Sequence, residues 1–517
     1  PGLSALEKET DKAFRVEAAK RTPKQGQTIK LNQDLMNFER LIVFMDPMRR
    51  EYSTGATENL VGIFGLGNTH GLAGLLQHEA ELRNLRRTAL PDVGGDFAAV
   101  QNLLKELDSA MRGTFNSPAI VPPQEHYSDQ ETWWQIADVI RESVTEEHDH
   151  SDQIAILASL EDMMATRHDP VAFHKNLEVL HATLTGQATA RGEYKHISQE
   201  VALYRLDPFT NGLVTFMLAF LLMAATWLKP NSKPLWYGQI ALAAVGLTYL
   251  IVGIVFRCVI RERPPVVTLY DTILFITACG VLVAFITEWI TRRRVAMAGG
   301  VILGLAGLFL AGKYELKEIS SSGDTMASVV AVLDTNFYLA IHVTTIAMGY
   351  AGGLLAALLA HAWIFGKAFG FKSQDRALYS SIYKMTYGVV CFCLLFSIFG
   401  TIMGGIWAND SWGRFWGWDP KENGALLICL WQLLTLHLRL GGFIRERGFA
   451  VMAVLGGIVV SASWWGVNLL NVGLHSYGFT SGVAYSLLSF WAIELGVVGL
   501  ALYGGIQHSG SKSTPAA

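Results

Sequence analysis

Cysteine is scarce in this sequence, and residues 1–210 have none. The cysteines are Cys258, Cys279, Cys391, Cys393 and Cys429. They form neither a Cys-x-x-Cys pair nor a Cys-x-x-Cys-His motif, so nothing supports a thiol redox pair or covalent haem attachment to this chain. All of them lie inside or at the ends of apolar runs, and we interpret them as small buried hydrophobic residues.

Charged residues are also few, at 16% of the 517 residues, and they are divided unequally. Residues 1–210 contain 21 Lys or Arg and 31 Asp or Glu, a net charge of −10. Residues 211–517 contain 20 and 13, a net charge of +7, so the overall charge of −3 is a cancellation. This division excludes one uniform globular enzyme, and it leaves no basic face for a nucleic-acid backbone.

The second part of the chain is rich in long apolar runs. Nine of them follow one another, each long enough to cross a bilayer, which takes about 20 helical residues. The polar sequence between them is too short to cover them in water. We therefore predict an all-α fold: a polytopic bundle of eight or nine membrane helices over 211–517, preceded by a mainly helical soluble domain over 1–210. The predicted spans are 211–228, 237–257, 271–290, 295–312, 338–365, 385–407, 424–440, 449–467 and 482–506.

Basic residues in the short loops predict the orientation of this bundle, because they resist translocation. One alternate set of loops contains 13 Lys or Arg, and the other contains 7. We place the first set in the cytoplasm, so that nine crossings leave residues 1–210 on the exported side. The chain opens at Pro1 without a signal peptide or an early apolar helix. We expect it to be a piece of a longer polypeptide whose upstream part supplies a membrane anchor.

The acidic part carries helix signals rather than strand patterns. Ser128 to Glu131 is typical of a capping box at the start of a helix. A second amphipathic helix is predicted from Asp169-Pro170, through periodic apolar residues, to Gly186. The acidic and histidine-rich run at 146–150 lies in polar sequence, and we interpret it as a solvated loop rather than a metal site. The sequence shows no nucleophile triad, phosphate loop or dinucleotide-binding turn.

The most informative stretch separates the sixth and seventh spans, from Trp407 to Asn423. Four tryptophans fall within twelve residues there. An aromatic belt at the membrane interface is one interpretation, but a belt does not require the adjacent Asp419-Pro-Lys-Glu422. Closely packed aromatic faces with backbone N–H groups and charges at one edge suit a large, flat, apolar ligand with an ionic rim. Haem is such a ligand.

Haem iron also needs axial ligands, and neutral imidazole is a common one. His342 lies at the outer mouth of the fifth span and His475 in the outer loop after the eighth, on the predicted side of the tryptophans. Together these features predict an iron held between two imidazoles. His437 lies within the seventh span, where it either ligates a second haem or hydrogen-bonds across helices. His361 is a weaker candidate for that role.

The pattern Trp412-Gly413-x-x-Trp416-x-Trp418-Asp419-Pro-Lys-Glu422 resembles the WWD signature of the haem-handling proteins of cytochrome c biogenesis. The order His342, His437, His475 is similar to that of the CcsA, or ResC, type. The segment Arg263-Pro-Pro-Val-Val-Thr-Leu-Tyr270-Asp271 resembles an outer-loop motif of the same family.

This resemblance implies that His342 and His475 ligate haem b at an external site and that His437 ligates haem in transit. The face of the haem would be held by Trp412, Gly413, Trp416, Trp418 and Asp419. It further implies a bacterial inner membrane protein, with residues 1–210 and the tryptophan loop on the periplasmic side. A CcsB or ResB partner would help it attach haem to Cys-x-x-Cys-His of apocytochrome c, as a component of a cytochrome c synthase.

Other classes remain alternatives at the level of sequence. CcmC and CcmF share the tryptophan signature, but nine spans fit neither well. A transporter should show an internal repeat, and none is visible. A respiratory subunit with b-type haem would place histidine pairs inside its spans, whereas the two best ligands here lie outside them. The acidic part lacks the β-rich pattern of a CcsB domain, so a partner is still to be found.

Overall fold

The computed structural model describes residues 2–16, 22–65, 67, 69–88, 96–115, 117–123, 132–146, 148–322, 324–326, 337–372, 374–470, 472 and 481–510. The chain divides into two compact units, Pro1–Lys195 and His196–Ala517. Residue 210, where the sequence placed the domain boundary, lies within the first long apolar helix of the second unit.

The first unit is mainly helical, as predicted, and has its own apolar core. Its only strands in the described ranges are β1 and β2, a two-residue antiparallel pair in which Tyr52 faces His70. The core gathers leucine, isoleucine and valine side chains such as Leu72, Leu103 and Ile140. Its elements are α1 Gly2–Phe14, α2 Pro23–Val43, η2 Pro47–Arg49, β1 Tyr52–Ser53, α3 Glu58–Phe64, β2 Thr69–His70, α4 Leu72–Leu76, α5 Glu79–Thr88, α6 Asp96–Thr114, α7 Ile136–Thr145, α8 Ser151–Ala165 and α9 Pro170–Ala190.

Helix starts in this unit follow the sequence signals in one case and depart from them in another. The Asp169 carboxylate accepts hydrogen bonds from the backbone N–H groups of Val171 and Ala172, so it caps α9 as predicted. The predicted capping box at Ser128 lies outside the described residues. The helix that follows begins at Ile136, where Gln135 and Asp138 form the capping box instead.

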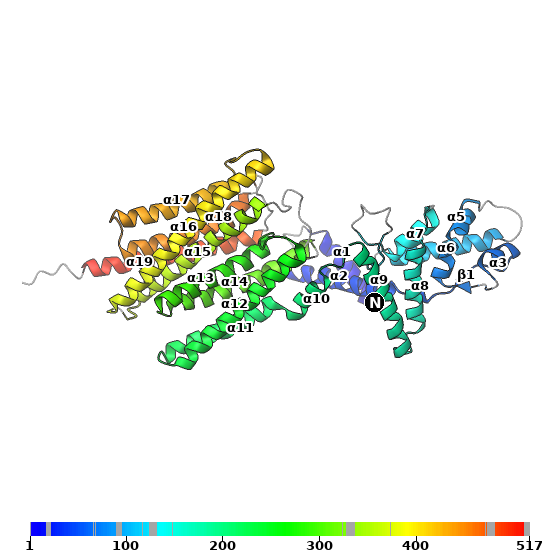
Figure 1. Cartoon of the computed structure of the whole chain (residues 1–517), viewed down its shortest axis with the longest axis horizontal. Coiled ribbons are helices and arrows are strands. Elements are labelled where there is room, and N and C mark those ends of the chain that lie inside the picture. Colours follow the sequence, from blue (N-terminus) through cyan, green and yellow to red (C-terminus); the bar gives the residue numbers. More distant parts are fainter. Residues whose placement is uncertain are drawn as a thin grey trace, which may run out of the picture. The chain divides into compact units, whose positions relative to one another are not determined.

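The second unit is a bundle of long helices that run alongside one another (Figure 1). Nine helical segments in the described part are long and apolar enough to cross a membrane, which confirms the predicted polytopic bundle. The elements are α10 Ile197–Leu206, α11 Pro208–Leu228, α12 Lys233–Arg261, α13 Leu269–Thr291, α14 Val295–Ser322, α15 Phe337–Ala368, α16 Arg376–Trp412, α17 Pro420–Leu440, α18 Glu446–Trp464, η5 Gly466–Leu470 and α19 Ser481–Gly510.

Two boundaries differ from the predicted ones for local reasons. The first span reaches back to Ile197 and contains a break at Asp207, whose φ of 40° separates α10 from α11. The sixth helix continues to Trp412, so Trp407 and Trp412 belong to its last turns rather than to a loop. The helix stops where Gly413 adopts a left-handed conformation with φ 68°, which glycine does without steric cost.

Helix α15 is the most buried of the spans and carries the cavity described below. It packs most extensively against α16. Close approach of these two helices depends on glycine, because a Cβ atom on Gly400 would lie 2.7 Å from the backbone nitrogen of Ile346. This tight seam fixes the register between the first turns of α15 and the last turns of α16.

Candidate functional site

His342 is held against α16 by a backbone hydrogen bond. Its Nδ1 lies 2.7 Å from the carbonyl oxygen of Gly400. A carbonyl only accepts, so Nδ1 carries the proton and Nε2 is the basic nitrogen of the neutral ring. The imidazole also stacks parallel to the Trp407 indole, with centroids 6.4 Å apart and planes 6° apart. Both contacts fix the direction of a side chain that lines a cavity.

Glycine at position 404 makes this placement of the ring possible. A Cβ atom there would lie 2.6 Å from Nδ1 of His342, closer than real contacts allow. We predict that Gly404→Ala displaces the imidazole and breaks its bond to Gly400, weakening any ligand bound through Nε2 by at least about tenfold, the equivalent of one hydrogen bond. The measurement is ligand affinity of the purified variant. Gly499→Ala on α19, where a Cβ meets nothing within 4 Å, is the matched control; equal affinities in the two variants would contradict this view of the site.

The tryptophans divide between the end of α16 and the loop that follows it. Trp407 is buried and meets Trp412 edge to face, with centroids 4.7 Å apart. In the loop, Trp416 and Trp418 are likewise nearly perpendicular, at 83°. Trp416 lines the cavity, and its buried indole N–H makes no hydrogen bond within the described structure. Trp418 is 69% exposed and is not a cavity-lining residue.

The acidic residues after the tryptophans hold the loop in place. Glu422 accepts hydrogen bonds from the backbone N–H groups of Gly417, at 2.7 Å, and Asp419, at 3.3 Å, and pairs with Arg414 at 3.1 Å. Asp419 in turn accepts from the N–H groups of Lys421 and Glu422, at 2.8 and 3.0 Å, completing a capping box on α17. Asp419 and Glu422 therefore hold the loop in its conformation, and Glu422 also lines the cavity.

The cavity has a volume of about 430 Å³, within the range of small-molecule pockets. Aromatic and aliphatic groups form most of its wall, and several charged side chains are also present. Along α15 its lining extends from Leu339 to Tyr350, a depth of roughly 16 Å at the helical rise. Besides His342 and Trp416, the residues used below are Arg263, Glu318, Phe415, Lys421 and Trp464.

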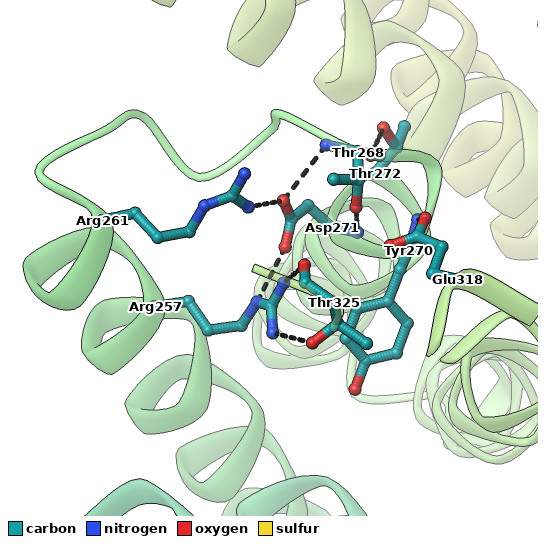
Figure 2. Close-up of polar contacts among 8 residues, drawn as sticks. All are labelled: Arg257, Arg261, Thr268, Tyr270, Asp271, Thr272, Glu318 and Thr325. Atoms are coloured by element: carbon teal, nitrogen blue, oxygen red, sulfur yellow. Dashed lines mark hydrogen bonds and ion pairs between the residues drawn. The ribbon is translucent and has the colours of Figure 1, made fainter. Parts of the chain in front are cut away.

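One wall of the cavity is the segment from Arg263 to Leu269, and a buried ionic network anchors it (Figure 2). Asp271 accepts from Nε of Arg257 and from a guanidinium nitrogen of Arg261, both at 2.8 Å. The two arginines come from the end of α12, and Asp271 comes from the first turn of α13. Asp271 and Thr268 also form the capping box of α13. All three charged side chains are at most 7% exposed.

The same network reaches the segment after α14. Arg257 donates to the hydroxyl of Thr325 at 2.9 Å and to its carbonyl oxygen at 2.7 Å. Its guanidinium also lies 4.9 Å from the centre of the Tyr270 ring. Arg257 thus ties three chain segments together beside the cavity, as Figure 2 shows. The segment from Arg263 to Asp271 carries part of the family resemblance. It therefore both forms a wall of the cavity and holds the neighbouring chain segments together.

Two charged residues on the wall are each held by backbone groups. The Glu318 carboxylate accepts from the N–H of Tyr270 at 3.0 Å, and burial raises the pKa of this carboxyl group. The Lys421 ammonium donates to the carbonyl oxygen of Trp464 at 2.5 Å, at the last turn of α18. Positive charge suits the carbonyl end of a helix. Trp464 stacks on Tyr350 at 5.9 Å, so Lys421 helps to fix an aromatic part of the wall.

The three predicted iron ligands have different placements. His342 lines the cavity, whereas His475 lies outside the described residues. His437 is exposed near the other end of α17, with Nδ1 2.8 Å from the carbonyl oxygen of Leu433. It lies sixteen residues beyond Lys421, roughly 24 Å along the helix. His361, the weaker candidate, pairs with Glu494 at 3.3 Å.

Sequence reasoning missed several residues that build this site. Trp464 and Tyr350 line the cavity, yet only the Trp464-Trp465 pair at the end of a span offered a signal for them. Phe415 also lines the cavity, and it lies within the tryptophan-rich stretch that the sequence singled out. Gly404 carried no signal, because its role comes from the neighbouring helix. Of the residues predicted to hold the face of the haem, Trp416 lines the cavity, whereas Trp412, Gly413 and Asp419 do not. Trp412 contacts Trp407, Gly413 ends α16 and Asp419 caps α17.

Comparison with known proteins gives a consistent result over the second unit. Residues 266–475 match the family model described as cytochrome C assembly protein. The chain is similar to the cytochrome c biogenesis protein CcsA of Prochlorococcus marinus, with 27% identity over 305 residues, covering 53% of this chain and 95% of the relative. It is also similar to CcsA of a Synechococcus species, 28% over 298 residues with 52% and 95% covered, and of Chlorella vulgaris, 28% over 305 residues with 51% and 94% covered.

Proposed function

Since this chain is a CcsA-type cytochrome c biogenesis protein, with residues 266–475 matching the cytochrome c assembly family, we propose that its cavity binds haem b for attachment to apocytochrome c. The observation that carries the proposal is the fixed imidazole of His342 in an aromatic cavity. Its Nδ1–H is bound to a backbone carbonyl, a common arrangement for metal-ligating histidine, because it fixes the ring and leaves Nε2 basic.

The residues of the cavity fit haem in three respects. Phe415, Trp416 and Trp464 supply apolar faces to a flat macrocycle. The buried indole N–H of Trp416 lacks a partner in the described structure, so a carboxylate of the ligand would satisfy it. The basic side chains of Arg263 and Lys421 line the wall together with the acidic side chains of Glu318 and Glu422, so basic partners for the two carboxylates of haem are present. His475 is proposed as the second axial ligand on sequence grounds.

In this proposal the protein acts mainly by positioning. Each thioether forms when a thiol of apocytochrome c adds S–H across a vinyl double bond of haem, and no group leaves. Axial imidazoles hold the iron and the anchored cavity wall orients the macrocycle, so the thiols meet the vinyl groups at high effective concentration. The proposal also includes a partner protein of the CcsB or ResB type. It further includes the Cys-x-x-Cys-His motif of the apocytochrome as the place where haem is attached.

Trp416 and Trp418 provide a matched pair for testing the cavity. Trp416→Ala removes a wall and a hydrogen-bond donor, so haem retention should fall at least about tenfold, corresponding to roughly 1.4 kcal/mol or more. Trp418→Ala should leave retention within about twofold, because this side chain is exposed and outside the lining. Haem content per purified chain is the readout. Equal losses of haem in both variants would instead support the interpretation of this loop as an interfacial aromatic belt.

His437 supports a second part of the proposal, in which haem reaches the cavity from the opposite end of the bundle. Its ring is exposed on a helix face that also exposes Leu430 and Leu434, where a ligand from the partner could complete an iron site. We predict that His437→Ala lowers haem loading in cells at least about tenfold. Added haem should still bind to the purified variant at the cavity as in wild type. If haem loading in cells and haem binding to the purified variant were lost together, His437 would affect the cavity itself.

A further inference from the structure

A buried pair of ionisable side chains lies in the membrane unit away from the cavity. His361 is on α15 and Glu494 is on α19, and their side chains are 14% and 5% exposed. His361 follows His342 by nineteen residues, roughly 28 Å along the same helix. Ionisable groups within membrane spans are costly, so such a pair calls for a functional explanation.

The contacts of the pair favour a proton on one of its two groups. The approach of the two side chains is an ion-pair contact, and Oε2 of Glu494 makes no hydrogen bond within the described structure. Nδ1 of His361 lies 2.7 Å from the carbonyl oxygen of Ala357, so that nitrogen donates its proton there. Nε2 faces Oε2 of Glu494 at 3.3 Å. Without a shared proton, a nitrogen lone pair would face a carboxylate oxygen in a buried setting, which is repulsive. With it, the pair is neutral overall, as an imidazolium with a carboxylate or as an imidazole with a carboxylic acid.

We propose that His361 and Glu494 form an intramembrane site that binds one exchangeable proton and fastens α19 to the bundle. The other recorded contacts of the imidazole are with Ala357 and with the Phe365 ring, at 5.7 Å, neither of which titrates. Glu494 is the charged side chain that contacts His361 within the described structure. The proposal does not depend on haem.

The proton controls the first of two contrasting polar contacts of α19. The second joins the indole N–H of Trp491 to the hydroxyl of Ser461 on α18, at 3.0 Å, and contains no titrating group. Loss of the shared proton turns the first contact repulsive and leaves the second intact. Proton loss should therefore loosen α19 locally without unfolding the bundle.

Isotope-edited infrared titration of the full chain in lipid nanodiscs tests the site. We expect a glutamate carboxyl signal and a histidine ring signal to change together at one midpoint, because they belong to one coupled pair. Glu494→Gln keeps a side-chain N–H that can donate to Nε2, so it should fold while abolishing the shared transition. Glu446→Gln, at the start of α18, is the control and should retain it. Separate midpoints in wild type, or an unchanged histidine midpoint in Glu494→Gln, would overturn the proposal.

Hydrogen exchange of α19 measures the second half of the proposal. After correction for the intrinsic pH dependence of exchange, protection of α19 in wild type should fall as pH rises through the shared midpoint. In Glu494→Gln the protection should no longer change with pH. The same pH response in both proteins would show that the pair does not fasten the helix.

Discussion

Replacement of Asp271 by asparagine should lower the stability of the membrane unit by about 3–5 kcal/mol, the usual cost of breaking a buried ion pair. Asparagine retains the shape and the capping ability of aspartate but leaves Arg257 and Arg261 without their shared carboxylate. Two guanidinium groups would then be buried without the carboxylate that they share. Thermal unfolding in detergent, followed by tryptophan fluorescence, measures the change.

A chemically identical substitution elsewhere in the bundle serves as its control. Asp375 caps α16 by accepting from the N–H of Leu378 at 2.9 Å, and asparagine caps helices about as well as aspartate. Asp375→Asn should therefore cost less than about 1 kcal/mol. If the two variants unfold at similar temperatures, the network of Asp271 does not anchor the cavity wall. Haem retention in Asp271→Asn should fall as well, because the Arg263–Leu269 segment loses its support.

Substitution of His342 by alanine should have the largest effect on function. The change removes the histidine that lines the described part of the cavity and that we propose as an iron ligand. We expect haem retention and cytochrome c maturation to fall by at least about a hundredfold, which corresponds to roughly 2.7 kcal/mol of lost binding. The paired measurements are haem content of the purified protein and yield of holocytochrome in a reconstituted maturation assay.

A stability measurement separates loss of the ligand from loss of the fold. The imidazole is only partly buried and donates one hydrogen bond to Gly400. Its removal should therefore cost little more than about 1–2 kcal/mol of unfolding free energy. If the variant retains haem at the wild-type level, His342 is not a ligand of the iron. If the variant unfolds outright, the role of His342 is structural, which also contradicts the proposal.

The bundle and the importance of His342 to the cavity could be predicted because they depend on local features of the sequence. Span length and apolar composition determine a membrane helix almost by themselves, and nine such segments are found among the described residues. His342 stood out because histidine is rare in an apolar span and lies near the tryptophan pattern in the predicted topology. The cap of α9 at Asp169 is equally local.

The wall of the cavity could not be predicted, since it depends on contacts between distant segments. Arg257 and Thr325 meet across 68 positions, and Lys421 meets Trp464 across 43. Such pairs leave no periodic pattern in a single sequence. The tryptophan pattern was informative about the place of the site but not about individual roles, because Trp418 belongs to the same motif yet is exposed.

The most direct test of haem ligation by His342 is chemical rescue followed by optical spectroscopy. Purified His342→Gly, incubated with haem and then titrated with imidazole, should regain the low-spin spectrum of the wild-type complex, because free imidazole fills the space of the missing side chain. Gly499→Ala, treated in the same way, should show that spectrum without added imidazole. A His342→Gly protein that gives the wild-type haem spectrum before imidazole is added would show that the iron is not bound to His342.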